Sequence, residues 1–241
     1  MADEVLYQLR GSAAWLTIDR EARRNTLDPA AIDLLLSHLD RAAADPAVRV
    51  VCLTGAGDKA FCAGADLAAF GSGEAASGPM RYARLLQRMR GHPKPLVARV
   101  NGHCLAGGLG PMLSCDVVYA REGIRLGVPE ATVGLFPMMV AALLLRDGLR
   151  KKVLELVYTG EPVTAREAEA AGLLSRVVPD GELDAAVEKV LGRIAAAAPL
   201  AVQMGRRALA EAEGPLLDQA VDRLSRRLGD LLATEDAAEG L

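Results

Sequence analysis

Residues 94–110 read KPLVARVNGHCLAGGLG, and this stretch decides the fold class. Its first part, Pro95–Val100, is a short apolar run typical of a buried strand. The glycine-rich part that follows, Gly102–Gly110, reads as a turn that leads into a short helix. A strand that ends in a glycine-rich turn before a helix is typical of parallel α/β proteins, in which ligands bind at the strand ends.

A similar strand and loop precede it in residues 50–67, VVCLTGAGDKAFCAGADL. The run Val48–Thr54 predicts another buried strand, and the stretch Ala60–Gly78, rich in Gly and Ala, reads as a loop. Glycine lets a backbone N–H approach a ligand with no side chain in the way. Two such N–H groups from different loops, converging on one carbonyl oxygen, make an oxyanion hole. On composition alone, tight turns without chemistry are the simpler interpretation.

Strands and helices alternate along the first half of the chain, and helices follow. The other expected strands are Val5–Leu9, Ala13–Ile18, Asp116–Ala120, Leu126–Gly127 and, among the later helices, Leu174–Val178. One helix begins at Pro29 behind an Asp28 cap, and another covers Met80–Met89. The order predicts an α/β protein with a core domain of residues 1–185 and a helical region of residues 186–241.

The composition is that of a globular protein with a sizeable core. The chain has 241 residues, of which 51% are hydrophobic and 24% charged, and its net charge is −3. No basic field recruits nucleic acid or an anionic membrane. The N-terminus carries acids where a signal peptide would be basic and then apolar, and no apolar stretch approaches the ~20 residues of a spanning helix. We therefore expect a cytoplasmic protein with neither a nucleic-acid nor a membrane partner.

Cysteine and histidine do not form a metal-binding pattern. Cys52, Cys62, Cys104 and Cys115 show no CxxC spacing and lie in or beside apolar segments, and the three histidines are scattered. We expect free thiols that pack as small hydrophobic groups, and no metal site.

Several motifs resemble the crotonase (enoyl-CoA hydratase/isomerase) superfamily, in its order and spacing, over nearly the whole chain. They are Arg24-Asn25-Thr26-Leu27, the two stretches quoted above, SCDVVYA (114–120), LGVPEATVGL (126–135) and YTGEPVTAREAEAAGLLSRVVP (158–179). The resemblance implies a crotonase-like spiral of ββα units with a helical C-terminal part. It also implies an acyl-CoA substrate, so that coenzyme A enters with the substrate and no separate cofactor is needed. Family members form trimers, often paired into hexamers, which would make residues 186–241 the trimerisation region.

The resemblance also assigns site residues by motif position. The oxyanion donors would be the backbone N–H groups of Ala65 and Gly107, and the loop Ala65–Ala68 would lie along the pantetheine and adenine of coenzyme A. The substrate-binding set comprises Ala63, Ala65, Asp66, Leu67, Ala68, Gly107, Gly108, Gly110 and Met138. Met138 and Met139 are adaptable side chains that would line an acyl pocket or belong to an ordinary helix core.

The acidic residues distinguish this sequence within the resemblance. Hydratases of the family carry two glutamates, one after the glycine run and one in the later Pro-Glu pair. Here Glu130 is present, but Gly110 stands at the other position. Moving a double bond needs one base that removes a proton and returns it to a neighbouring carbon, whereas adding water also requires the water to be held and activated. Glu130 as the single base therefore favours isomerisation over hydration.

Other functions stay open from the sequence. A hydratase, a crotonase-like decarboxylase or a thioesterase would use the same oxyanion hole. A catalytically inert family member acting as a binding subunit is the non-enzymatic alternative.

The end of the chain predicts an amphipathic helix with an apolar stripe that needs a cover. The stripe consists of Leu216, Ala220, Leu224, Leu228 and Leu231. We expect this helix at or near a subunit contact.

Overall fold

The computed structural model describes residues 4–65, 77–213, 215–232 and 234. Strands form two sheets, a larger one of six strands and a smaller one of four. The larger sheet holds, in spatial order, β1 (Val5–Arg10), β2 (Ala13–Ile18), β3 (Val50–Gly55), β5 (Leu96–Val100), β7 (Val117–Arg121) and β10 (Arg176–Val178). The smaller sheet holds β4 (Ala60–Cys62), β6 (His103–Leu105), β8 (Arg125–Gly127) and β9 (Val163–Thr164).

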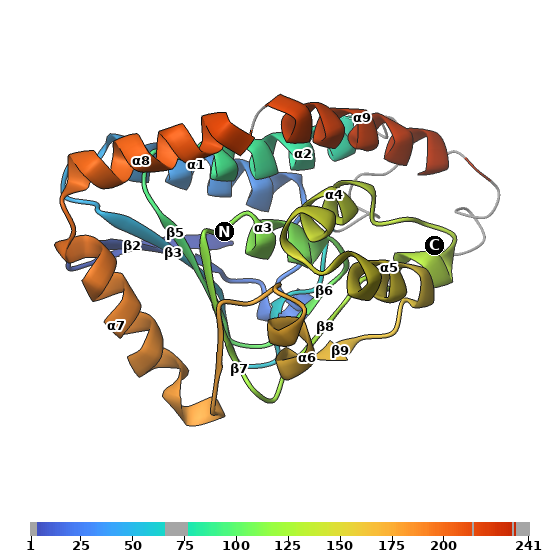
Figure 1. Cartoon of the computed structure of the whole chain (residues 1–241), viewed down its shortest axis with the longest axis horizontal. Coiled ribbons are helices and arrows are strands. Elements are labelled where there is room, and N and C mark those ends of the chain that lie inside the picture. Colours follow the sequence, from blue (N-terminus) through green and yellow to red (C-terminus); the bar gives the residue numbers. More distant parts are fainter. Residues whose placement is uncertain (1–3, 66–76, 214, 233, 235–241) are drawn as a thin grey trace.

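Helices surround both sheets (Figure 1). They are α1 (Pro29–Ala44), α2 (Ser77–Arg90), α3 (Leu109–Leu113), α4 (Met138–Asp147), α5 (Arg150–Thr159), α6 (Ala165–Ala170), α7 (Leu183–Ala196), α8 (Pro199–Glu213) and α9 (Pro215–Leu232). Short 3₁₀ turns lie at η1 (Glu21–Arg23), η3 (Ala106–Gly108), η4 (Pro129–Val133) and η5 (Asp180–Glu182).

The chain visits the two sheets in turn, which makes a spiral. From β3 onward, each unit places one strand in the larger sheet, the next in the smaller sheet and then a helix: β3-β4-α2, β5-β6-α3 and β7-β8-α4. Strands β2, β3, β5, β7 and β10 pair in parallel, and so do β4, β6 and β8. The expected α/β spiral of ββα units is confirmed.

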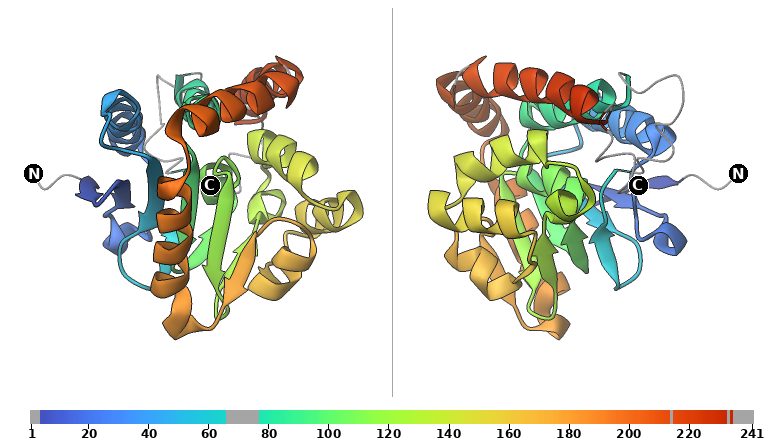
Figure 2. Two further views of the ribbon diagram at one scale, coloured as in Figure 1. Left: turned by 60° about the vertical axis from the view of Figure 1, so that its left-hand side comes forward. Right: turned by 90° about the vertical axis from the view of Figure 1, so that its right-hand side faces the viewer.

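The central strand β3 of the larger sheet is buried on both faces because successive side chains alternate between two helical layers. In β3, Val51 and Leu53 belong to the main core beneath α1 and α2. Val50 and Cys52 face the other way and pack with Leu183 and its neighbours on α7. Figure 2 shows α7, in orange, along this second face. All six residues of β3 are buried, which explains its unbroken apolar sequence.

Capping and turn residues stand at the ends of several elements, and the predicted Asp28–Pro29 start of α1 is confirmed. The Asp28 carboxylate accepts a hydrogen bond from the Ala31 N–H, and Pro29 occupies the first position of α1. Thr164 and Glu167 form a capping box at α6. Gly11, in the turn between β1 and β2, has a φ of +57°, which glycine adopts without strain.

Three strands differ from the predictions. β4 lies within the predicted loop Ala60–Gly78, β6 lies within the predicted turn Gly102–Gly110, and β9 interrupts a region expected to be helical. Each is only two or three residues long, too short for a hydrophobic period to develop. They are strands because the spiral brings them together, with Cys104 paired to Cys62 on one side and to Leu126 on the other.

The C-terminal stripe is covered by the chain itself. Helix α9 lies across α2 and α4 (Figure 1). Val221 is fully buried, and Leu224 and Leu228 pack against the main core. The cover that the sequence predicts for this stripe is thus supplied, for these residues, by the same chain, and a subunit contact near α9 stays a prediction; the side chain of Leu216 lies outside the described part of the chain. The expected domain boundary at residues 185/186 falls inside α7.

The described cysteines are all free and buried, as expected for small hydrophobic groups. No group of three or more His, Cys, Asp or Glu side chains suited to a metal ion occurs in the described ranges. Within the same ranges, no helix has the length and apolar character needed to cross a membrane.

Candidate active site

The first glycine turn, which follows β4, is held by a residue far earlier in the chain. The Leu27 N–H donates to the Gly64 carbonyl oxygen at 2.9 Å, and Leu27 and Ala65 form a parallel bridge. Asn25, which is fully buried, anchors this support by donating through Nδ2 to the carbonyl oxygens of Ala56 and Ala60. Gly64 has a φ of +112°, which side-chain-bearing residues rarely adopt, so glycine is required there.

The second turn, η3, presses against β4. A β-carbon at Gly108 would lie 2.2 Å from the Cys62 carbonyl oxygen, so only glycine fits this contact. Ala106, the first residue of the turn, has a φ of +50°. A positive φ at a residue other than glycine stores strain, and such strain concentrates at functional sites.

The amides of Ala65 and Gly107 lie side by side. A β-carbon built on Gly107 would lie 3.1 Å from the Ala65 nitrogen, and one built on Gly64 would lie 3.3 Å from the Gly107 nitrogen. Because Gly107 is in the first turn of η3, its N–H has no acceptor within that turn. The two N–H groups that the motif resemblance assigned as oxyanion donors are thus brought together from two separate strand ends.

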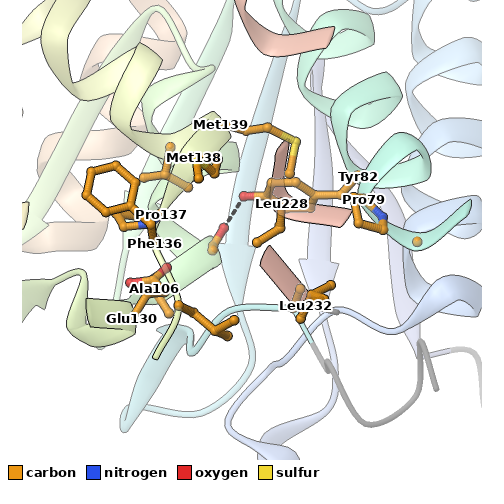
Figure 3. A pocket seen from close by; sticks show the side chains of 15 residues that line it. Pro79, Tyr82, Ala106, Glu130, Phe136, Pro137, Met138, Met139, Leu228 and Leu232 are labelled. Atoms are coloured by element: carbon orange, nitrogen blue, oxygen red, sulfur yellow. Dashed lines mark hydrogen bonds between the residues drawn. The ribbon is translucent and has the colours of Figure 1, made fainter. Parts of the chain in front are cut away.

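A cavity of about 80 Å³ opens beside these amides (Figure 3). Its walls are mainly apolar and come from the segments around α2, α4 and α9. The described residues that line it are Ala65, Gly78, Pro79, Tyr82, Ala106, Gly107, Glu130, Leu135, Phe136, Pro137, Met138, Met139, Val140, Leu228 and Leu232. Met138 and Met139 both line it, which favours the acyl-pocket interpretation of this pair.

Glu130 supplies the acidic side chain of the cavity. It lies in η4, just beyond the end of β8, and the Leu135 N–H donates to its carbonyl oxygen at 2.9 Å. Its Oε2 atom is buried without a hydrogen-bond partner among the described residues. Burial raises the pKa of Glu130 from 4.5 to about 7. A carboxyl group whose pKa lies near 7, in an apolar site, is suited to act as a general base.

Tyr82 is the functional candidate that the sequence interpretation missed. It projects from α2, is buried, and its hydroxyl donates to the Gly107 carbonyl oxygen. A β-carbon at Gly110 would lie 2.0 Å from that hydroxyl oxygen. The only signal in the sequence is an aromatic residue within the apolar face of α2, in a chain with 3% aromatic residues.

The other predicted site residues are only partly brought together. Gly108 and Gly110 are buried beneath the turn and shape it rather than line the cavity. Ala63 donates its N–H to the Arg24 carbonyl oxygen at 3.1 Å. Asp66, Leu67 and Ala68 lie outside the described residues.

Asp116, in the matching motif SCDVVYA, has a structural role. Its carboxylate accepts from the Leu96 N–H at 2.7 Å and pairs with Arg206 at 2.9 Å, which connects α8 to the start of β5. His103 is exposed on β6, and its Nδ1 accepts from the Arg125 N–H. Neither side chain lines the cavity.

This arrangement is suited to removing a proton next to a carbonyl group. Two adjacent amides can donate to a carbonyl oxygen that gains negative charge, and the apolar walls strengthen that interaction by excluding water. Glu130 lines the same cavity, where its carboxylate can accept a proton. Oxygen stabilisation and proton transfer are the two requirements for forming an enolate.

Comparisons with known proteins show the family of the chain. The family described as "Enoyl-CoA hydratase/isomerase" matches residues 9–241. A putative enoyl-CoA hydratase of Thermus thermophilus is 36% identical over 96% of this chain and 94% of its own length. The 2,3-dehydroadipyl-CoA hydratase of Escherichia coli is 35% identical over 94% of this chain and 89% of its own. The crystal structure of an enoyl-CoA hydratase from Mycobacterium avium superposes with a TM-score of 0.90 at 31% identity, covering 100% of this chain and 95% of that one. Motifs, spiral fold and matches over nearly the full length agree, and the chain belongs to the enoyl-CoA hydratase/isomerase family of the crotonase superfamily.

Proposed function

We infer that the protein acts on an acyl-CoA thioester, with the acyl group in the apolar cavity and its thioester oxygen facing the Ala65 and Gly107 N–H groups. Coenzyme A is then part of the substrate rather than a separate cofactor. The observation that carries the inference is the buried, unpartnered Oε2 of Glu130 in the same cavity as these two amides. A carboxylate left without a partner in an apolar wall costs stability, so its presence there points to a role in the reaction.

The reaction that these groups support best is a double-bond shift. Glu130 removes a proton from the α-carbon of a 3-enoyl thioester, and the electrons move onto the thioester oxygen to form a dienolate. The two amides stabilise that oxygen. The protonated Glu130 then returns the proton to the γ-carbon, which leaves the conjugated 2-enoyl thioester. Glu130 is the only carboxylate among the described residues that line the cavity, so one group serves both steps.

Hydration of a 2-enoyl thioester is the second candidate. It is favoured by the names of the relatives described above, which are hydratases. Hydration needs a water that is held and activated while a proton reaches the α-carbon. With Gly110 in place of an acidic side chain, the described part of the cavity offers no second carboxylate for that purpose.

Comparing the two reactions tests the proposal directly. We expect kcat/KM for conversion of a 3-enoyl-CoA to the 2-enoyl-CoA to exceed that for hydration of the same 2-enoyl-CoA by ~10-fold or more. The 2-enoyl chromophore appears in the first reaction and disappears in the second, so one spectrophotometric assay follows both. Hydration as fast as isomerisation would replace the first candidate with the second.

The protein is also expected to assemble as a trimer or a dimer of trimers. Support comes from α8, where Leu200, Met204 and Leu209 are exposed by 68%, 64% and 68%. Large apolar side chains gathered on one exposed helix mark a surface that binds protein. Light scattering at micromolar concentration should give three or six chain masses, and Met204→Asp should lower that number. Lys189→Asp, at an exposed position on α7, is the control and should leave the mass unchanged. A monomeric parent protein would refute the expectation.

A further inference from the structure

The Tyr82 hydroxyl connects the two halves of the candidate site. Tyr82 lines the cavity that Glu130 also lines, and its O–H donates to the carbonyl oxygen of Gly107, the residue whose N–H faces the expected thioester oxygen. Figure 3 shows this hydrogen bond within the cavity that Glu130 faces. The hydroxyl is therefore joined directly to the turn that carries one oxyanion donor.

The same hydroxyl occupies the space that a side chain at residue 110 would need. A β-carbon at Gly110 would lie 2.0 Å from the Tyr82 hydroxyl oxygen and 3.0 Å from both its Cζ atom and the Leu86 Cδ2 atom. The ring cannot move aside easily, because Tyr82 and Leu86 are both part of the main core. A side chain at residue 110 and the Tyr82 phenol exclude each other in this packing.

The phenol remains a hydrogen-bond donor throughout the physiological pH range. Burial is the main cause that raises the pKa of Tyr82 well above 10, and the nearby Glu130 carboxylate adds to it. A group that stays protonated cannot serve as a base near neutral pH, but it holds its acceptor in place at every working pH. Its acceptor belongs to η3, which begins with the strained Ala106 and needs its surroundings to hold it.

We propose that Tyr82 is a positioning residue of the reaction site: its hydroxyl holds the Ala106–Gly108 turn so that the Gly107 N–H points at the thioester oxygen, and it takes the space of a side chain at residue 110. The proposal rests on the proposed function for its effect on turnover, but not for its effect on the turn. Orientation matters here because a displacement of about 1 Å at a reacting group costs about 10²-fold in rate.

Tyr82→Phe tests the hydrogen bond. We expect kcat to fall about 10- to 100-fold with little change in KM, since the oxyanion contact strengthens as the enolate forms. Tyr119→Phe is the matched control, because Tyr119 lies on the other face of the sheet, among α7 residues, and should keep the parent kcat. A folded Tyr82→Phe variant with a kcat within about twofold of the parent overturns the proposal.

A second measurement does not depend on the reaction. In the uniformly ¹⁵N-labelled protein, the resonance of the Gly107 amide should shift in Tyr82→Phe but not in Tyr119→Phe, because only the first variant loses the hydrogen bond to the Gly107 carbonyl oxygen. An unchanged Gly107 amide overturns the role of the hydroxyl. If the parent converts neither enoyl-CoA, the proposed function fails, whereas this amide measurement still decides for or against Tyr82.

A double-mutant cycle tests the shared space. Gly110→Ala in the parent forces a β-carbon against the hydroxyl and should lower kcat about 10-fold or more, whereas in the Tyr82→Phe background the added loss should be smaller. Equal losses of kcat in both backgrounds would contradict the claim that the Tyr82 hydroxyl and a side chain at residue 110 compete for the same space. The same packing predicts that Gly110→Glu alone does not add hydratase activity, because Tyr82 blocks the space into which the new side chain would enter.

Discussion

Glu130→Gln is expected to lower kcat/KM for both enoyl-CoA isomerisation and hydration by about 10²–10⁴-fold, the contribution of a well-placed acid–base group. The amide has nearly the shape of the carboxylate but accepts no proton at neutral pH. The measurement is the change in 2-enoyl absorbance with purified parent and variant. Glu188→Gln makes the same chemical change on the exposed surface of α7 and should leave kcat/KM unchanged. Isomerisation that survives Glu130→Gln would exclude the single-base mechanism.

The pH dependence of the parent follows from the same residue. Burial raises the pKa of Glu130 to about 7, and only the ionised form takes a proton. We therefore expect kcat/KM to rise about tenfold per pH unit below 7 and to level off above it. A rise centred near the ordinary carboxyl pKa would contradict a desolvated base.

The stability of the Glu130→Gln variant provides a control on folding. Because the pKa of Glu130 is higher in the folded protein than its ordinary value of 4.5, the folded state binds more protons than the unfolded state between these pH values. The parent's free energy of unfolding therefore falls as pH rises from 4.5 through about 7, since ionisation leaves a charge in the apolar wall. Glutamine does not ionise, so the variant should be at least as stable as the parent at pH 8. Loss of activity in such a variant cannot be attributed to unfolding.

Gly107→Pro is expected to lower turnover by about 10²-fold or more, the usual effect of removing one oxyanion donor. Proline has no N–H, and its ring enters the space beside the Ala65 nitrogen. Proline also restricts the residue before it, and Ala106 already has a φ of +50°. The loss should appear mainly in kcat, because the donor acts most strongly on the enolate oxygen.

Gly107→Ala is the control for the steric effect of a side chain at this position. It keeps the N–H and adds a β-carbon 3.1 Å from the Ala65 nitrogen, a tight contact that proline shares. The alanine variant therefore measures the cost of the β-carbon alone, and any further loss of kcat in the proline variant comes from the missing N–H together with the restriction that proline places on Ala106. Circular dichroism checks that both variants fold. Parent-like turnover in a folded Gly107→Pro variant would remove the assignment of Gly107 as an oxyanion donor.

Much of the fold could be predicted because its signals are local. The unbroken apolar run of β3, the Asp28-Pro29 start of α1 and the capping box at Thr164 each arise within a few neighbouring residues. Glu130 and Gly110 could be placed for the same reason, because each stands in a short motif at a set distance from its neighbours. The strands β4 and β6 carry no such signal because they stand within Gly- and Ala-rich stretches that read as a loop and a turn, and β9 is only two residues long.

Contacts between distant segments required the tertiary structure. The sequence identifies Glu130 as an acid beside a glycine motif, but its raised pKa results from the apolar walls that α4 and α9 bring around it. In the same way, the sequence shows that residue 110 lacks an acidic side chain, whereas the packing of α2 against α3 shows that the Tyr82 hydroxyl takes that space. The apolar stripe of α9 predicts burial, and only the completed fold decides that the cover is α2 and α4 of the same chain. Hydrophobic periods and turn signals are properties of neighbouring residues, while burial, desolvation and close approach depend on which segments meet after the chain has folded.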